Sequence, residues 1–182
     1  MQAGLDPAYP PLMKTDAIEI RLARQDDAGP IAEVHDAAWR NAYRGVIPGQ
    51  DLERMVVRRG PRWWKHAIDR KTRIVVLCFG GIIAGYATYG RNRAAGLPFQ
   101  GEIFEFYLRP EYQGIGLGRR LFNAVRRDLA GHDVKSLVVW ALADNEGACG
   151  FYRRLGGEPV DSTVERFGNA SLQKIAFGWH AA

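Results

Sequence analysis

A strand, a glycine-rich turn and a helix follow one another between residues 102 and 130. β-Branched and aromatic side chains run from Ile103 to Leu108, and Pro110 ends this strand. The turn Gln113-Gly-Ile-Gly-Leu-Gly118 leads into a helix, because apolar residues recur on one face at positions 117, 121, 122, 125 and 129. Backbone N–H groups that converge at such a turn, together with the helix dipole, favour an anion such as phosphate.

The spacing of the glycines distinguishes between phosphate ligands. A dinucleotide fingerprint counted from Gly114 requires a glycine where Arg119 stands, and the chain has no Gly-Lys-Ser/Thr tripeptide of a P-loop. The pattern Gln113-x-x-Gly116-x-Gly118 instead resembles the acyl-coenzyme A pyrophosphate loop of the GNAT family of N-acetyltransferases. For this pattern taken alone, a plain structural turn into a helix is the alternative interpretation.

Further segments carry the same resemblance. An apolar strand precedes Asn145, which can cap a helix, and the pattern Asn145-x-x-Ala148-x-x-Phe151-Tyr152-x-x-Leu155-Gly156 is similar to the second sequence block of the family. Residues 18–39 look like its first strand and helix, and residues 39–48 look like a substrate-side signature of one branch. The resemblance therefore covers the chain from about residue 17 to the C-terminus.

Periodicity and turn signals predict the order of the elements. Strands are expected at 17–23, 73–79, 82–90, 101–108, 135–141, 159–167 and 171–179, and helices at 27–42, 49–57, 61–69, 116–130 and 146–155. This order predicts an α/β (α+β) fold with a mixed, mostly antiparallel sheet and helices on both faces. The resemblance implies about seven strands and a splayed parallel strand pair. We expect one N-acetyltransferase domain, residues 17–182, after a flexible arm, residues 1–16.

The resemblance also implies how acetyl-CoA is bound as the acyl donor. In the family, the splay frees backbone groups that pair with the pantetheine arm, and the backbone amides of the glycine turn hold the pyrophosphate. Unpaired backbone groups inside a domain are costly, so a ligand that satisfies them makes physical sense. The implied cofactor-binding residues are Phe106, Tyr107, Leu108, Gln113, Gly114, Ile115, Gly116, Leu117, Gly118, Arg119, Asn145 and Tyr152.

Acetyl transfer to an amine needs a base for the ammonium group and an acid for the leaving thiolate. The resemblance assigns Tyr152 as the general acid; the alternative is that it only fills the apolar stripe of its helix. The resemblance makes Glu102 the leading base candidate, and Glu105 competes with it. Either carboxylate could instead form a salt bridge, and some members of the family use no protein base at all. Because Glu102 and Glu105 are three residues apart on a strand, we expect them to face opposite sides of the sheet.

The acceptor is the part that the sequence specifies least. Trp39, Tyr43 and Arg44 are the candidate substrate residues, since aromatic rings can cradle an ammonium group, but they can equally belong to the core. The resemblance implies an acetyl-CoA-dependent N-acetyltransferase that acts on a primary amine of a small molecule or peptide, by direct attack in a ternary complex. A non-catalytic acyl-CoA-binding sensor on the same fold is the alternative.

Composition argues against other classes of protein. The formal net charge of +5 comes from scattered arginines, so nucleic-acid binding is not expected. The cysteines and histidines show neither disulfide nor metal-ligand spacing, and we expect no metal. No apolar run approaches the roughly 20 residues of a membrane span, and no secretory signal is present, so we expect no membrane contact and a cytoplasmic location. Family habit also allows a homodimer in which the C-terminal strand, ending near Trp179, is exchanged or pairs across the interface.

Overall fold

The computed structural model describes residues 18–94 and 96–181, and the predicted arm over residues 1–16 lies outside this part of the chain. The described strands form one seven-stranded sheet in the order β1-β2-β3-β4-β5-β7-β6. Among these described strands only the β4–β5 pair is parallel, so the predicted mixed, mostly antiparallel sheet is confirmed. The strands are β1 (Ile18–Leu22), β2 (Ile74–Phe79), β3 (Ile82–Arg91), β4 (Gly101–Leu108), β5 (Leu137–Leu142), β6 (Glu158–Phe167) and β7 (Ala170–Trp179).

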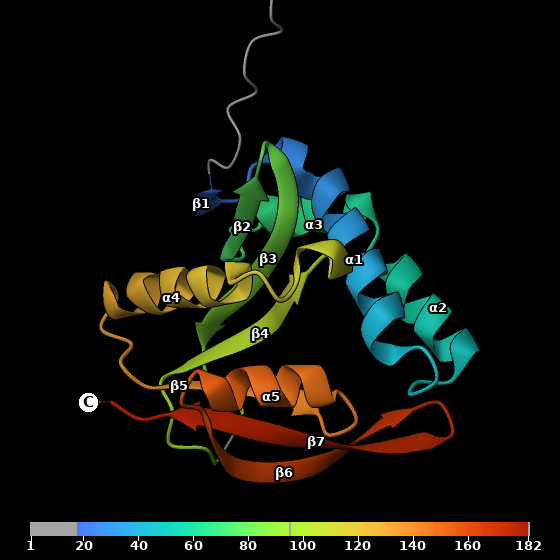
Figure 1. Ribbon diagram of the computed structural model, residues 1–182, viewed down its shortest axis with the longest axis vertical. Helices are drawn as coiled ribbons and strands as arrows, with labels where there is room; N and C mark the ends of the chain where they lie inside the picture. Colours follow the sequence, from blue (N-terminus) through green and yellow to red (C-terminus); the bar gives the residue numbers. More distant parts are fainter. Residues whose placement is uncertain (1–17, 95, 182) are drawn as a thin grey trace, which may run out of the picture.

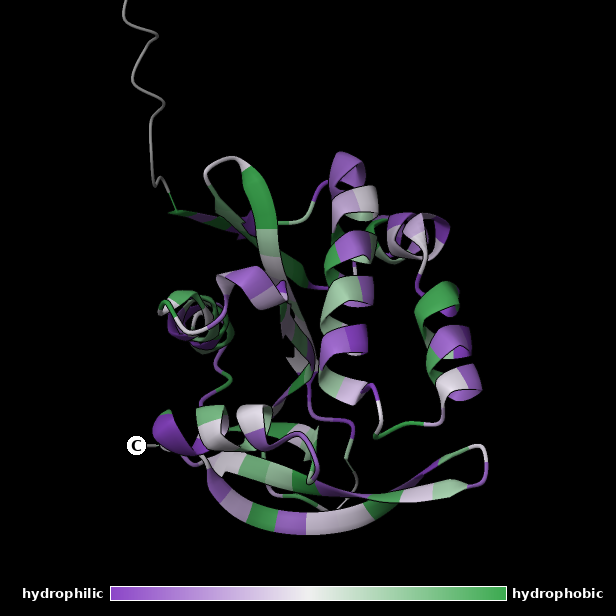
Figure 2. Cartoon of the chain, turned by 45° about the vertical axis from the view of Figure 1, so that its right-hand side comes forward, coloured by the Kyte–Doolittle hydropathy of each residue, from purple (hydrophilic) through white to green (hydrophobic). Residues whose placement is uncertain are grey.

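Helices cover both faces of the sheet, as predicted. They are α1 (Ala28–Tyr43), α2 (Gly49–Arg58), α3 (Pro61–Asp69), α4 (Leu117–Ala130) and α5 (Glu146–Arg154). In Figure 1, α4 and the group α1–α3 lie on opposite sides of β3 and β4. One core contains residues of α4 and α5, and a separate core contains residues of α1 and α3, including the fully buried Trp64. Figure 2 shows the helices banded purple and green, the pattern expected of helices with one buried face.

Local signals explain two of the connections. Gly80 and Gly81 both have positive φ, at 57° and 83°, which is what a tight two-residue hairpin between β2 and β3 requires. Asn145 caps α5, because its side-chain oxygen accepts a hydrogen bond of 3.1 Å from the backbone N–H of Ala148. The predicted hairpin turn and the predicted helix cap are both present.

The parallel strands β4 and β5 stay paired over a short distance only. Their register pairs residues 101, 102 and 103 with residues 137, 138 and 139, whereas β4 continues to Leu108 and β5 to Leu142. The antiparallel partner β3 holds β4 along its other edge as far as Leu108. The strands therefore diverge beyond Ile103, and the predicted splay is confirmed.

A bulge in β4 corrects one prediction. Thr88 pairs with Glu105 and Tyr89 with Ile103, so Phe104 is an extra residue on β4. As a result, Ile103 and Phe106 both belong to the core that contains α4, although strict alternation would separate them. The prediction that Glu102 and Glu105 face opposite sides of the sheet is therefore wrong: both lie on the face away from α4.

The C-terminal strand does not offer a free edge. β7 is hydrogen-bonded to β5 on one side and to β6 on the other. Trp179 pairs with Leu137 of β5, and Ala170 pairs with Phe167 of β6. A strand with both edges paired cannot add a second copy of the chain by simple strand pairing. The suggested pairing of this strand across a homodimer is therefore incompatible with the fold unless the strand is exchanged.

Candidate functional site

A cavity of about 830 Å³ opens where β4 and β5 diverge. Its walls come from the last turns of α1, the diverging ends of β4 and β5, the glycine turn before α4, and α5. Most of the residues predicted from the sequence line it, namely Tyr43, Glu105, Phe106, Tyr107, Leu108, Gln113, Gly114, Gly116, Gly118, Arg119, Asn145 and Tyr152. Five predicted residues are not among the lining residues: Trp39, Arg44, Glu102, Ile115 and Leu117.

The glycine turn presents an uncapped helix N-terminus to the cavity. Gly114 and Gly116 have φ of 77° and 89°, and Gly116 is the N-cap of α4 without any side-chain capping bond. The first N–H groups of a helix have no partner within the helix, and the first turn of α4 contains no acidic residue. Arg119 adds a positive charge at the same wall. This arrangement is suited to bind an anion.

Two residues of the glycine turn that were predicted to bind the cofactor, Ile115 and Leu117, do not line the cavity. Ile115 is 60% exposed and Leu117 is buried in the core, so only their backbone groups belong to the turn. The side chain of Gln113 donates a hydrogen bond of 3.1 Å from Nε2 to the carbonyl oxygen of Leu108. Gln113 thus fixes the turn to the end of β4 and is not a free side chain for a ligand.

Tyr152 lies at the wall formed by α5. It is buried, packs edge-on against Phe106, and has a neighbour, Phe151, that stacks on Phe106 at 5.6 Å between ring centroids. Burial raises the pKa of the Tyr152 hydroxyl well above its usual range, so this group keeps its proton at neutral pH. A protonated hydroxyl at the cavity wall can act as a proton donor.

Glu105 lines the cavity from β4, and two further acidic residues, Asp144 and Glu146, line it at the start of α5. Oε1 of Glu105 is 2.9 Å from Nη2 of Arg59, which follows α2, and its Oε2 accepts a hydrogen bond of 3.3 Å from the hydroxyl of Tyr86 on β3. Burial raises the pKa of Glu105, while the charge of Arg59 and the Tyr86 hydroxyl act in the opposite direction. A buried carboxylate with a raised pKa at a cavity wall has the properties of a general base.

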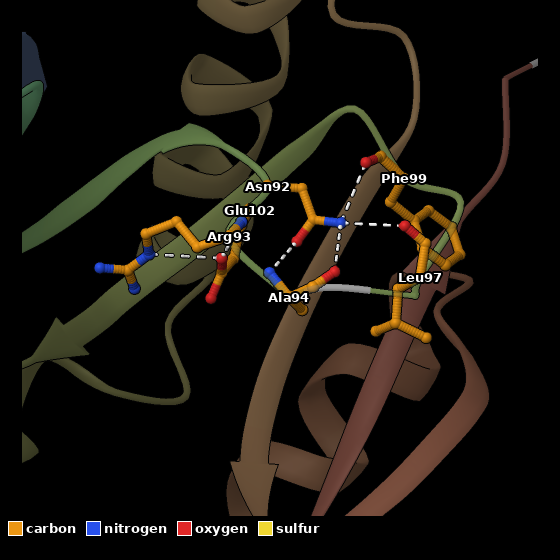
Figure 3. Close-up of polar contacts among 6 residues, drawn as sticks. All are labelled: Asn92, Arg93, Ala94, Leu97, Phe99 and Glu102. Carbon is orange, nitrogen blue, oxygen red and sulfur yellow. Dashed lines mark hydrogen bonds and ion pairs between the residues drawn. The ribbon is translucent and has the colours of Figure 1, made fainter.

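Glu102 has a different environment. It accepts hydrogen bonds from the backbone N and from Nε of Arg93, at 2.9 and 3.4 Å, and Arg93 lies over the Phe104 ring at 3.5 Å. Figure 3 shows this pair beside Asn92, whose side chain bonds carbonyl oxygens of the same loop. Glu102 therefore anchors the β3–β4 loop, which is the salt-bridge role that the sequence left open.

Of the three candidate acceptor-binding residues, one lines the cavity and two do not. Tyr43 lines the cavity at the end of α1, and its hydroxyl is 3.2 Å from that of Tyr107. Trp39 is half-buried behind it, in edge-on contact with the Tyr43 ring at 4.9 Å. Arg44 is exposed just beyond the helix. Of the three, only Tyr43 is in a position to touch a molecule in the cavity.

Sequence reasoning missed part of the lining. Phe104 and Trp140 line the cavity from the diverging strands, and Asn41 lines it from α1. No local motif marks these residues, because they reach the cavity through the bulge, the splay and the packing of α1. The sequence did offer one signal, which is their position near predicted elements. Phe104 is next to Glu105, Asn41 is two residues before Tyr43, and Trp140 belongs to the apolar strand before Asn145.

Two other searches of the described residues concern metals and membranes. Over residues 18–94 and 96–181, no group of three or more histidine, cysteine, aspartate or glutamate side chains is arranged to hold a metal ion. Within the same ranges, none of the helices combines the length and the apolar character that a membrane crossing demands.

Solved structures of other proteins share this fold. The chain superposes on the PaiA N-acetyltransferase of Thermoplasma acidophilum, solved in complex with coenzyme A, with a TM-score of 0.71, 17% identity, and coverage of 87% of this chain and 98% of that one. It also resembles the YncA acetyltransferase of Salmonella typhimurium, solved with acetyl-CoA, with a TM-score of 0.64, 20% identity, and coverage of 91% and 97%.

Sequence comparison identifies the family. The model described as the acetyltransferase (GNAT) family matches residues 31–157, and the chain therefore belongs to the GNAT family. It is 28% identical to the uncharacterized N-acetyltransferase YuaI of Bacillus subtilis over 89% of this chain and 92% of that one. It is also 28% identical to the mycothiol acetyltransferase of Streptomyces scabiei over 83% of this chain, but it spans only 46% of that relative's length.

Proposed function

We propose that this protein transfers the acetyl group of acetyl-CoA to a primary amine of a small molecule or peptide. The observation that carries the proposal is that one cavity joins the glycine turn, the diverging edge of β4, Tyr152 and Glu105. Each of these is a part that the reaction needs: an anion site, backbone groups for an extended arm, an acid and a base. Membership of the GNAT family and the names of the relatives support the same activity.

The cavity suits coenzyme A at two places. The uncapped N-terminus of α4 and the amides around Gly116 suit a pyrophosphate, and Arg119 adds charge. The edge of β4 that faces away from β3 has lost its pairing with β5 beyond Ile103, and it can pair with the amides of the pantetheine arm. In this pose the thioester comes to lie at the bottom of the splay, near Tyr152.

Direct attack requires a balanced set of proton transfers. Glu105 takes one proton from the acceptor ammonium, and the neutral nitrogen then attacks the carbonyl carbon of the thioester. A C–N bond forms, the C–S bond breaks, and the leaving sulfur takes the proton of the Tyr152 hydroxyl. The second proton of the nitrogen restores Tyr152, and Glu105 releases its proton to solvent.

The first experiment separates an enzyme from a sensor. Thiol release from acetyl-CoA is measured against amines, aminoglycoside-type antibiotics, amino acids, peptides and, because of the relatives' names, mycothiol-related amines. Binding of coenzyme A is followed by calorimetry in the same samples. Turnover with one class of acceptor supports the proposal, whereas tight binding without turnover on any acceptor favours the non-catalytic sensor. Absence of binding contradicts both functions.

Variants of the same chain test the two roles. Tyr152→Phe should bind coenzyme A as the parent protein does and lose turnover by about 10²–10⁴-fold, the usual contribution of general acid–base catalysis. Glu105→Gln and Glu102→Gln form a matched pair, because both carboxylates lie on β4 and pair with an arginine. We expect the larger loss of kcat for Glu105→Gln. A larger loss for Glu102→Gln would return the role of base to Glu102.

A further inference from the structure

A chain of buried hydrogen bonds stands behind Glu105, on the side away from the cavity. Nδ1 of His35, on α1, is 2.9 Å from the hydroxyl oxygen of Tyr86, and this hydroxyl lies 3.3 Å from Oε2 of Glu105. His35 is 1% exposed and Tyr86 is 0% exposed, so solvent cannot substitute for either partner. The other carboxylate oxygen of Glu105 is held by Arg59.

Chemistry fixes the direction of this chain. An ionised carboxylate only accepts hydrogen bonds, so the Tyr86 hydroxyl donates to Glu105. The oxygen of Tyr86 is then left to accept a hydrogen bond, and Nδ1 of His35 must donate it. Burial and the nearby charge of Arg59 lower the pKa of His35 to about 3, so the ring is neutral and carries its one proton on Nδ1. The donors run from His35 through Tyr86 to Glu105.

We propose that His35 and Tyr86 are positioning residues that hold the Glu105 carboxylate in its proton-accepting orientation. The inference rests on the proposed function, in which Glu105 takes the proton of the acceptor ammonium. Neither His35 nor Tyr86 is in a position to take that proton, because both are buried and neither is among the residues that line the cavity. Tyr86 fixes one oxygen of Glu105 and Arg59 fixes the other, so the remaining lone pairs can be turned toward the cavity.

The sign of the effect on Glu105 follows from its surroundings. Burial favours the neutral acid and raises its pKa, whereas a hydrogen bond donated to the ionised form lowers it. Removing the Tyr86 hydroxyl therefore raises the pKa of Glu105 further. The titratable and charged groups around Glu105 come from α1, the end of α2, β3, the β3–β4 loop and β4; they are His35 behind Tyr86, Arg59, Tyr86, Arg93 and Tyr107.

The chain offers a matched control for Tyr86. Tyr89 lies on the same strand, is also buried, and donates a hydrogen bond of 2.8 Å to a carboxylate, that of Asp128 on α4. It belongs to the core on the opposite face of the sheet. Tyr89→Phe thus removes the same kind of bond without touching Glu105.

The direct test is an NMR titration of the glutamate side-chain carboxyl carbons in the full chain, without any substrate. The Glu105 signal is assigned from its absence in Glu105→Gln. We expect Tyr86→Phe to raise the pKa of Glu105 and Tyr89→Phe to leave it unchanged. His35→Phe should shift it in the same direction by less, and His35→Asn, whose amide can donate from near the position of Nδ1, should partly restore it. An unchanged Glu105 titration in a folded Tyr86→Phe protein overturns the proposal.

A kinetic arm separates this proposal from the proposed function. With an acceptor that gives turnover, Tyr86→Phe should move the acidic limb of the kcat/KM profile to higher pH. Below that limb it should lose roughly tenfold, the order of a hydrogen bond to a charged group. If the NMR titration shifts while the kinetic limb does not, the chain sets the ionisation of Glu105 but Glu105 is not the base, and the base assignment falls. If neither shifts, the positioning role falls.

Discussion

Gly116 is the residue at which the anion site can be tested most directly. It is the N-cap of α4, its φ is 89°, and a Cβ added there would meet no protein atom within 4 Å. A methyl group at this position therefore projects into the open space in front of the turn. Gly96, in the β3–β4 loop, has nearly the same φ, 91°, and equally open surroundings. It serves as a matched control because it is not among the residues that line the cavity.

The added methyl group is expected to lower the stability of both variants, and to lower the affinity for coenzyme A only in Gly116→Ala. An alanine in the left-handed region costs about 1–2 kcal/mol. For a chain of this size, each kcal/mol lowers Tm by about 2–4 °C, so both Gly116→Ala and Gly96→Ala should melt roughly 2–8 °C lower. Hydrogen bonds to a charged group are worth about 1.5–3 kcal/mol. Displacing the pyrophosphate from the amides at Gly116 should therefore weaken coenzyme A binding by roughly 10–100-fold.

Thermal melting and calorimetric titration with coenzyme A measure the two quantities on the same samples. We expect the two variants to lose similar Tm and only Gly116→Ala to lose affinity. Equal dissociation constants for Gly116→Ala and Gly96→Ala would refute the reasoning, because a turn that tolerates an added methyl group does not hold the pyrophosphate with its backbone.

Two further predictions concern the cap of α5 and the buried histidine. Asn145→Ala removes the capping bond to Ala148 and should lower the free energy of unfolding by about 1 kcal/mol, or Tm by roughly 2–4 °C. Asn145→Asp should restore Tm but weaken coenzyme A binding, because it adds a negative charge at the cavity. A Tm of Asn145→Asp as low as that of Asn145→Ala would contradict the capping role. His35 stays neutral in the fold, where burial lowers its pKa to about 3, but the unfolded chain binds a proton below about pH 6.5. Stability is therefore lost as pH falls through this window, by at most about 1.4 kcal/mol per pH unit, and urea unfolding should show a flatter dependence for His35→Phe. Identical slopes for the two proteins would mean that His35 does not titrate on unfolding.

Much of the fold was predictable because its signals are local. The strand over residues 101–108 and the helix after the glycine turn follow from side-chain periodicity and from Pro110. The hairpin at Gly80 and Gly81 follows from the positive φ that only glycine adopts without cost, and the start of α5 follows from the capping chemistry of Asn145. These features depend on residues a few positions apart, so the sequence by itself determined them. The prediction that the strands form one sheet with a splayed parallel pair came from the resemblance to the GNAT family.

The tertiary structure alone decided how the chemistry is arranged. The bulge at Phe104, formed against β3, puts Glu105 on the same face as Glu102, and only Glu105 lies beyond the last β4–β5 pair, where the cavity opens. The bond from His35 to Tyr86 joins residues 51 positions apart. In the sheet, β7 lies between β5 and β6, an order that differs from their order along the chain. The physical reason is the same in each case: register and burial are set by contacts between distant segments, and a shift of one residue moves a side chain to the other face.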